Sequence, residues 1–122
     1  MSQTFQSLGK RRAPRYYLGG VVELTDLESG QMKVALVRAL SLYGCLVKTE
    51  MPVNEEGRVA LKIAHSGTQF SATGRVVNCV GSKSNRGLGI EFTEIKPRDK
   101  IRLEAWLSDL AAAHGLPPVP NP

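Results

Sequence analysis

The sequence predicts an all-β (mainly β) protein, a six-stranded antiparallel barrel with one C-terminal α-helix. Three observations lead to this class. The length of 122 residues suits a single domain. Short runs rich in β-branched and aromatic residues follow one another between turn signals, and the middle of the chain shows no helical period. One amphipathic segment appears, and it lies near the C-terminal end.

Each expected strand is a short apolar run that ends at turn-forming residues. The clearest is RVALKIAH, where strict alternation puts Val59, Leu61 and Ile63 on one face. Ser66 and Gly67 then join this run to the next one, as in a hairpin. The expected strands are 16–25, 32–40, 45–50, 58–65, 68–80 and 88–92.

The expected helix begins at Pro97, because proline suits a first helical position. Apolar residues then recur at i, i+3, i+4 and i+7, and this stripe should pack on the barrel. This spacing predicts that Trp106, the sole tryptophan, packs in the core and does not stack on a ligand. The stripe consists of Leu103, Trp106, Leu107 and Leu110.

The two ends of the chain differ from the segment between them. Residues 1–9 are polar and without period, so we expect a disordered arm, and 114–122 form a proline-rich tail that can hold no helix or central strand. The folded domain is therefore expected at 10–113. No run approaches the roughly 18 apolar residues of a membrane span, and the start does not resemble a secretory signal. We expect a cytoplasmic protein without membrane association.

Few residues suggest catalysis or metal binding. His65 and His114 each lack a second histidine or a cysteine at ligand spacing, so each is expected to be a surface or packing residue. No glycine-rich phosphate loop precedes a helix. Cys45 and Cys79 lie in apolar runs and are expected to be buried free thiols. We therefore expect no enzyme, no metal and no cofactor.

The net charge of +5 is concentrated near the N-terminus, where Lys10, Arg11, Arg12 and Arg15 contribute four of the five charges. A protein that coats nucleic acid usually spreads its basic residues over a face, and it offers aromatic stacking platforms. One short basic segment and 6% aromatic residues make nucleic acid a weaker candidate than a small anionic ligand. Taken alone, however, such a segment is more often a solvated tail.

A second unusual segment is RALSLYGCLVKT. Its strand ends at Ser41, breaks, and resumes after Gly44. A glycine here serves a tight turn or the close approach of a ligand, and the Ser41 hydroxyl can donate to a phosphate. Taken alone, this segment is more simply a hairpin turn or a bulge.

In their order and spacing, the two segments resemble the PilZ domain family. The sequence has RxxxR at Arg11 and Arg15, SxxG at Ser41 and Gly44, then GRVV and GLGIEF, and the resemblance covers about residues 10–110. It implies a six-stranded PilZ barrel that serves as a receptor for the bacterial second messenger cyclic di-GMP. In that family the RxxxR arginines clamp phosphates and guanine faces, and [D/N]xSxxG holds a guanine edge and a phosphate. The ligand-binding residues that the resemblance implies are Lys10, Arg11, Arg12, Arg15, Ser41 and Gly44.

The chain departs from the family at Ala39, which stands where the second motif has Asp or Asn. A methyl group cannot accept the guanine N–H donors, and leaving them unpaired costs about 1–3 kcal/mol, or roughly five- to 150-fold in affinity. Strand alternation puts Ala39 and Ser41 on one face and Arg38 on the other, so Arg38 is not expected to replace the missing acid.

The sequence therefore leaves two functions open. One is a cyclic di-GMP receptor whose ligand orders the N-terminal arginine segment, so that the domain signals to a protein partner controlling motility, adhesion or matrix production. The other is a PilZ-fold protein-interaction module of a pilus, motility or regulatory complex that has lost nucleotide binding.

Overall fold

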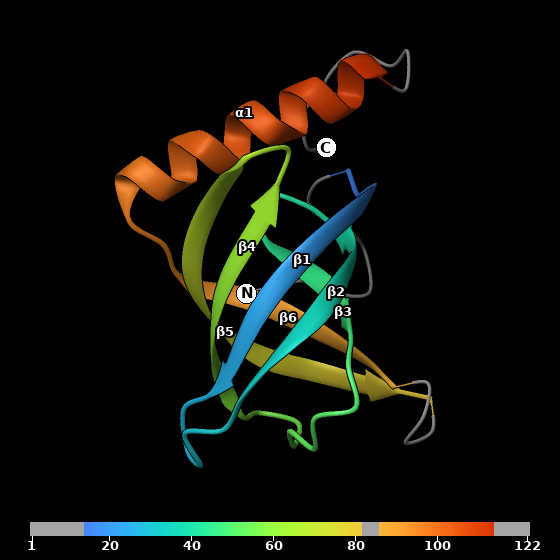
Figure 1. Ribbon diagram of the computed structural model, residues 1–122, viewed down its shortest axis with the longest axis vertical. Coiled ribbons are helices and arrows are strands. Elements are labelled where there is room, and N and C mark those ends of the chain that lie inside the picture. Colours follow the sequence, from blue (N-terminus) through green and yellow to red (C-terminus); the bar gives the residue numbers. More distant parts are fainter. Residues whose placement is uncertain (1–13, 82–85, 114–122) are drawn as a thin grey trace, which may run out of the picture.

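Six antiparallel strands close into a barrel in the computed structural model, which describes residues 14–81 and 86–113, and one helix lies across one end of the barrel (Figure 1). The order around the barrel is β1-β2-β3-β6-β5-β4. This is the fold class that the sequence predicts. The elements are β1 (Tyr16–Asp26), β2 (Met32–Leu40), β3 (Gly44–Lys48), β4 (Arg58–His65), β5 (Thr68–Val80), β6 (Gly87–Glu94) and α1 (Pro97–Ala113).

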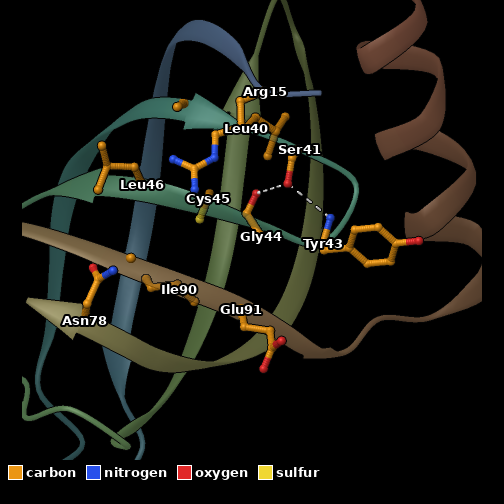
Figure 2. A pocket seen from close by; sticks show the side chains of 12 residues that line it. Arg15, Leu40, Ser41, Tyr43, Gly44, Cys45, Leu46, Asn78, Ile90 and Glu91 are labelled. Carbon is orange, nitrogen blue, oxygen red and sulfur yellow. Dashed lines mark hydrogen bonds between the residues drawn. The ribbon is translucent and has the colours of Figure 1, made fainter. Parts of the chain in front are cut away.

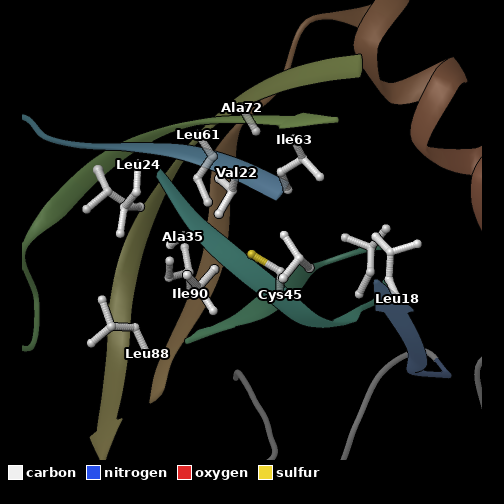
Figure 3. Packing of buried hydrophobic residues seen from close by; sticks show 14 of the residues in the cluster. Leu18, Val22, Leu24, Ala35, Cys45, Leu61, Ile63, Ala72, Leu88 and Ile90 are labelled. Carbon is white, nitrogen blue, oxygen red and sulfur yellow. The ribbon is translucent and has the colours of Figure 1, made fainter. Parts of the chain in front are cut away.

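The strands alternate between the barrel interior and the solvent, as their period of two requires. In β4, for example, Val59, Leu61 and Ile63 are buried as predicted, while Arg58 and Lys62 are exposed. Figure 3 shows side chains from different strands meeting inside the barrel. Each fully buried aliphatic side chain contributes about 1.5–3 kcal/mol. This buried core supplies the main stabilisation of the barrel and fixes the positions of the strands that carry the site.

The connection between β3 and β4 closes the end of the barrel away from α1 (Figure 1). Met51 and Val53 in this connection are almost completely buried in the same core cluster. The Oγ1 atom of Thr49 accepts a hydrogen bond from the Met51 N–H at 3.0 Å and fixes the start of the connection. The strand expected at 45–50 ends at Lys48, and the sequence predicts no element over 51–57.

Helix α1 begins at Pro97, as predicted. Leu103 and Trp106 are buried, and the Trp106 ring packs edge-on against Phe70 with ring centroids 5.2 Å apart. The interpretation of Trp106 as a core residue is therefore confirmed. Leu107 and Leu110 are partly buried against the same cluster. Among the described residues, α1 is the only helix, and it is not long and apolar enough to cross a membrane.

Side chains of α1 also cap an open strand edge. Strand β6 pairs with β5 only from Thr73 onward, which leaves the first residues of β5 without a strand on that side. Arg102 of α1 donates to the Gln69 carbonyl at 2.8 Å, and Asp99 accepts from the Ser71 N–H at 3.1 Å. The helix thus supplies hydrogen bonds that a longer β6 would otherwise make.

Candidate functional site

A pocket of about 200 Å³ opens beside the turn that joins β2 and β3 (Figure 2). Arg15, Ser41 and Gly44 line it, together with Ala39. The fold therefore brings together three of the six residues that the sequence predicts for a ligand site. The other three lie outside the described residues; they are Lys10, Arg11 and Arg12. The remaining lining residues are Leu40, Tyr43, Cys45, Leu46, Asn78, Gly89, Ile90 and Glu91.

The Ser41 side chain holds the turn in shape. Its Oγ accepts from the Tyr43 N–H at 3.2 Å and donates to the Gly44 carbonyl at 3.4 Å (Figure 2). The Ser41 N–H also donates to the Gly44 carbonyl at 2.9 Å. A serine that bonds a backbone group two residues ahead is a common way to fix a turn. The donation to Gly44 is long, so the hydroxyl hydrogen is the part of this group most easily redirected to a ligand.

Gly44 is required by its close contact with β6. A Cβ atom at this position would collide with the Ile90 carbonyl oxygen and would lie 3.2 Å from the Glu91 Cα. The residue is not among those with positive φ, so turn conformation is not the reason for glycine here. The SxxG spacing therefore reflects a β3–β6 packing requirement as well as any ligand.

A bulge at Arg38 changes the face that this residue occupies. The β2–β3 register shifts between Val37 and Ala39, so Arg38 is the extra residue. Ala39 lies opposite Leu46 on the outer face of the barrel, and directly opposite residues share a face. Arg38 and Ala39 then line the same second hollow, of about 290 Å³. The prediction from strict alternation, that Arg38 faces away from Ala39, is wrong because a bulge interrupts the period of two.

The second hollow adjoins the first, because Ala39 and Leu46 line both. Its rim carries Arg38, Lys48 and Arg86, and none of the described residues that line it is acidic. A strongly exposed aromatic ring, that of Tyr17, also lines it.

Among the described residues that line the first pocket, Glu91 alone carries a carboxylate, and Arg75 binds it at 2.9 Å. Arg75 thus offsets the negative charge of Glu91. Arg15 and the three basic residues of the second hollow then give the outer surface around β2 and β3 a positive character that suits an anion.

Sequence reasoning missed Asn78. It lies opposite Gly89 on β6, and a Cβ on Gly89 would come within 2.5 Å of the Asn78 Oδ1. A register shift between Val76 and Asn78 turns this side chain outward, whereas alternation from the buried Val76 would turn it inward. An amide inside the apolar run from Val76 to Val80 was the available signal. Asn78 offers the pocket both a donor and an acceptor.

The histidines and cysteines considered from the sequence do not form a second site among the described residues. His65 packs edge-on against Trp106, with ring centroids 5.6 Å apart, and His114 lies outside the described residues. Residues 14–81 and 86–113 contain no cluster of three or more side chains that could hold a metal ion. Cys45 is a buried free thiol as predicted, whereas Cys79 is a free thiol that is only half-buried.

The chain matches the PilZ domain family over residues 9–109. Similar solved structures include the inhibitor of motility MotI/DgrA of Bacillus subtilis, at 15% identity and a TM-score of 0.72, covering 85% of this chain and 52% of that one. The PilZ domain of Escherichia coli YcgR with c-di-GMP has 17% identity and a TM-score of 0.70, covering 86% and 94%. The K. pneumonia MrkH–c-di-GMP complex has 19% identity and a TM-score of 0.69, covering 87% and 53%.

A comparison with curated proteins finds no match. The chain spans about half of the MotI and MrkH chains and nearly all of the YcgR domain. At these identities the structural likeness concerns the fold, and the family match covers most of the sequence. With its six-stranded barrel and C-terminal helix, this chain belongs to the PilZ domain family.

Proposed function

We propose that this chain is a cyclic di-GMP receptor module that binds the nucleotide on the outer face of β2 and β3. The observation that carries the proposal is the convergence of Arg15, Ser41 and Gly44 on one pocket. PilZ domains are cyclic di-GMP receptors and not enzymes, and the similar YcgR and MrkH structures contain c-di-GMP. The ligand is a small dianion, which agrees with the positive surface described above.

Arg15 is the proposed phosphate clamp. A guanidinium group binds two phosphate oxygens through parallel N–H bonds and also stacks on bases. Lys10, Arg11 and Arg12 precede it and would complete the clamp. Ser41 would donate its hydroxyl hydrogen, which makes only the long 3.4 Å bond to Gly44 in the free protein.

Arg38 is proposed to compensate in part for Ala39. Both residues line the hollow next to the pocket. Arginine donates to O6 and N7 of guanine, whereas the acid of the family motif accepts from the N–H groups. Arg38 would therefore bind a different edge of the guanine base. The N–H donors of the guanine would still need water as their acceptor. Binding is proposed to be weaker than with an acid at position 39, by the factor of roughly five to 150 estimated above.

Signalling is proposed to follow from ordering of the N-terminal segment. A ligand that binds Lys10, Arg11, Arg12 and Arg15 favours conformations in which these residues lie against the barrel. The ordered segment and the ligand then form a surface that a protein partner can recognise. Motility, adhesion and matrix production are the outputs that membership of the family suggests.

Calorimetric titration with cyclic di-GMP tests the proposal. Wild type should bind, Arg15→Ala should bind at least tenfold more weakly, and Ala39→Asp should bind five- to 150-fold more tightly. Arg58→Ala is the matched control, because this exposed arginine on β4 lines neither hollow. Absence of heat with wild type at tens of micromolar, together with binding by Ala39→Asp, would show that the natural protein is not a receptor.

That last result would favour the second candidate, a PilZ-fold protein-interaction module that no longer binds the nucleotide. The observation behind it is the methyl group of Ala39 at the position of the guanine acceptor. Single-stranded RNA belongs in the same titration as a competitor. Competition as effective as that of unlabelled cyclic di-GMP would instead indicate a nucleic-acid-binding protein.

A further inference from the structure

Strand β2 is longer than the strand beside it. Pairing with β3 covers Leu36–Leu40, because β3 has only five residues and the chain then leaves toward β4. The first four residues of β2, Met32–Ala35, therefore have β1 on one side and no strand on the other. We call this segment the open edge.

The direction of the backbone groups follows from the β1–β2 ladder. The Asp26 N–H donates to the Gln31 carbonyl at 2.9 Å, and the Asp26 carbonyl accepts from the Gly30 N–H at 2.7 Å, so both backbone groups of Asp26 face β2. Bonded and non-bonded pairs alternate along an antiparallel ladder. Met32 and Val34, one and three residues beyond Gln31, therefore turn their N–H and C=O groups away from β1. No backbone or side chain in the described part of the protein is recorded as bonding these groups.

The open edge differs from the other unpaired segment of the barrel. On β5, the residues that β6 does not reach are capped by Asp99 and Arg102 of α1. Nothing comparable covers Met32–Ala35 among the described residues. Barrels usually avoid exposed edges of this kind, because a free row of N–H and C=O groups is a template for another strand.

Exposed apolar side chains surround the open edge on the outer face. Val34 is 66% exposed, Met32 52% and Leu36 51%. Val21 of β1, which lies directly opposite Leu36, is 44% exposed and extends the apolar surface. A strand that paired with Met32 and Val34 would place its own alternate side chains beside these residues.

The charge of Lys33 favours a different partner over a second copy of this chain at the open edge. In antiparallel self-pairing, the free backbone groups of Met32 would bond those of Val34 in the second copy. Lys33 would then lie opposite Lys33 of that copy. Like charges directly opposite are destabilising. Lys33 is exposed and forms no recorded ion pair with another described residue, and the exposed Lys48 lies opposite Leu36. An acidic residue is the favourable neighbour here.

We propose that the open edge binds an extended segment of a partner protein, with an acidic residue opposite Lys33 and apolar residues opposite Met32 and Val34. The segment adds a strand to the barrel, so backbone bonds supply affinity and the apolar–acidic–apolar pattern supplies specificity. This interaction does not require cyclic di-GMP and remains testable if nucleotide binding fails.

Amide exchange measured by NMR on the full chain tests the proposal with three synthetic probes. The first is a capped pentapeptide with a central glutamate between two valines, a length that does not reach the residue opposite Leu36, where Lys48 already lies. The second has lysine in place of the glutamate. The third keeps the glutamate but carries N-methyl groups on both valines, which removes the N–H donors that would face Met32 and Val34 and leaves the side chains unchanged.

In the free protein the amides of Met32 and Val34 should exchange faster than those of Lys33 and Ala35, which point to β1. The glutamate peptide at millimolar concentration should slow hydrogen exchange of the Met32 and Val34 amides. The lysine peptide should bind about two- to fivefold more weakly, and Lys33→Glu should reverse this preference. Val77→Thr, which changes an exposed valine on β5, should alter nothing.

Three results would overturn the proposal. Slow exchange of Met32 and Val34 in dilute free protein would mean that the edge is already covered. Equal binding of the N-methylated peptide would mean that no strand is added. Protection that rises with protein concentration, without peptide, would identify a second copy as the occupant.

Discussion

Gly44 shows how one residue can serve the fold and the site together. Its backbone lies against Ile90 and Glu91 on β6, so an added methyl group collides with backbone that cannot rotate away. We expect Gly44→Ala to lower the free energy of unfolding by about 1–3 kcal/mol, as overpacking usually does. Urea denaturation measures this. Gly19→Ala is the matched control, because a Cβ at Gly19 meets nothing within 4 Å. Equal losses in the two variants would contradict the packing explanation.

Cys45 lies beside Gly44, and burial raises the pKa of its thiol from about 9 to about 12. The unfolded chain releases this proton at a lower pH than the folded protein does. A group with a raised folded pKa stabilises the fold below its unfolded pKa, and this contribution is lost as pH rises. Stability should therefore fall between about pH 9 and about pH 12, by roughly 1 kcal/mol per pH unit from this thiol.

The measurement is the difference between wild type and Cys45→Ala in urea denaturation across that pH range. Effects of pH on the rest of the protein are common to both variants and cancel in the difference. Cys45→Ala should be less stable at pH 8, because it leaves a small cavity, and the gap should narrow as pH rises. A gap that stays constant up to pH 11 would mean that Cys45 ionises in the folded protein as readily as in the unfolded chain.

At the level of elements, the bulges explain most of what the sequence could not predict about the site. Alternation predicted the core faces of the strands correctly, because each buried face needs an apolar residue at every second position. It failed at Arg38, and applied to β5 it would have turned Asn78 inward, because one extra residue reverses the facing of those that follow. Turn-forming residues mark the ends of strands in the sequence, but a bulge inside an apolar strand carries no comparable signal. The buried connection at Met51 and Val53 was missed because its apolar positions are too few to show a period.

Helix α1 offers a prediction about how an element closes a sheet edge. Asp99→Ala removes the acceptor of the Ser71 N–H, so exchange of this amide should become faster and stability should fall by about 1 kcal/mol. Asp99→Asn keeps an oxygen acceptor and should preserve much of the protection. Glu104→Ala, an exposed change on the same helix, is the control. Unchanged exchange at Ser71 in Asp99→Ala would mean that the helix does not cap the edge in solution.

For the whole molecule, the fold was predictable while the site was predictable only in part. Short strands, turn residues and the late amphipathic helix are local signals, and they sufficed for a barrel with one helix. The meeting of Arg15 with Ser41 and Gly44 depends on pairing across strands, which the family resemblance supplied and periodicity did not. That Arg38 and Ala39 line the same hollow emerged only from the register of β2 against β3.

The proposed receptor function links the N-terminal arginines to global stability. Cyclic di-GMP at 100 times its Kd should raise the free energy of unfolding by about 2.7 kcal/mol, which corresponds to a Tm increase of roughly 10 °C. Deletion of residues 1–13 should abolish this increase, because it removes Lys10, Arg11 and Arg12 from the proposed clamp. Cyclic di-AMP, with the same phosphates and a different base, is the control ligand. A full Tm increase in the deletion variant would show that the segment before residue 14 takes no part in binding, and the ordering mechanism would then be wrong.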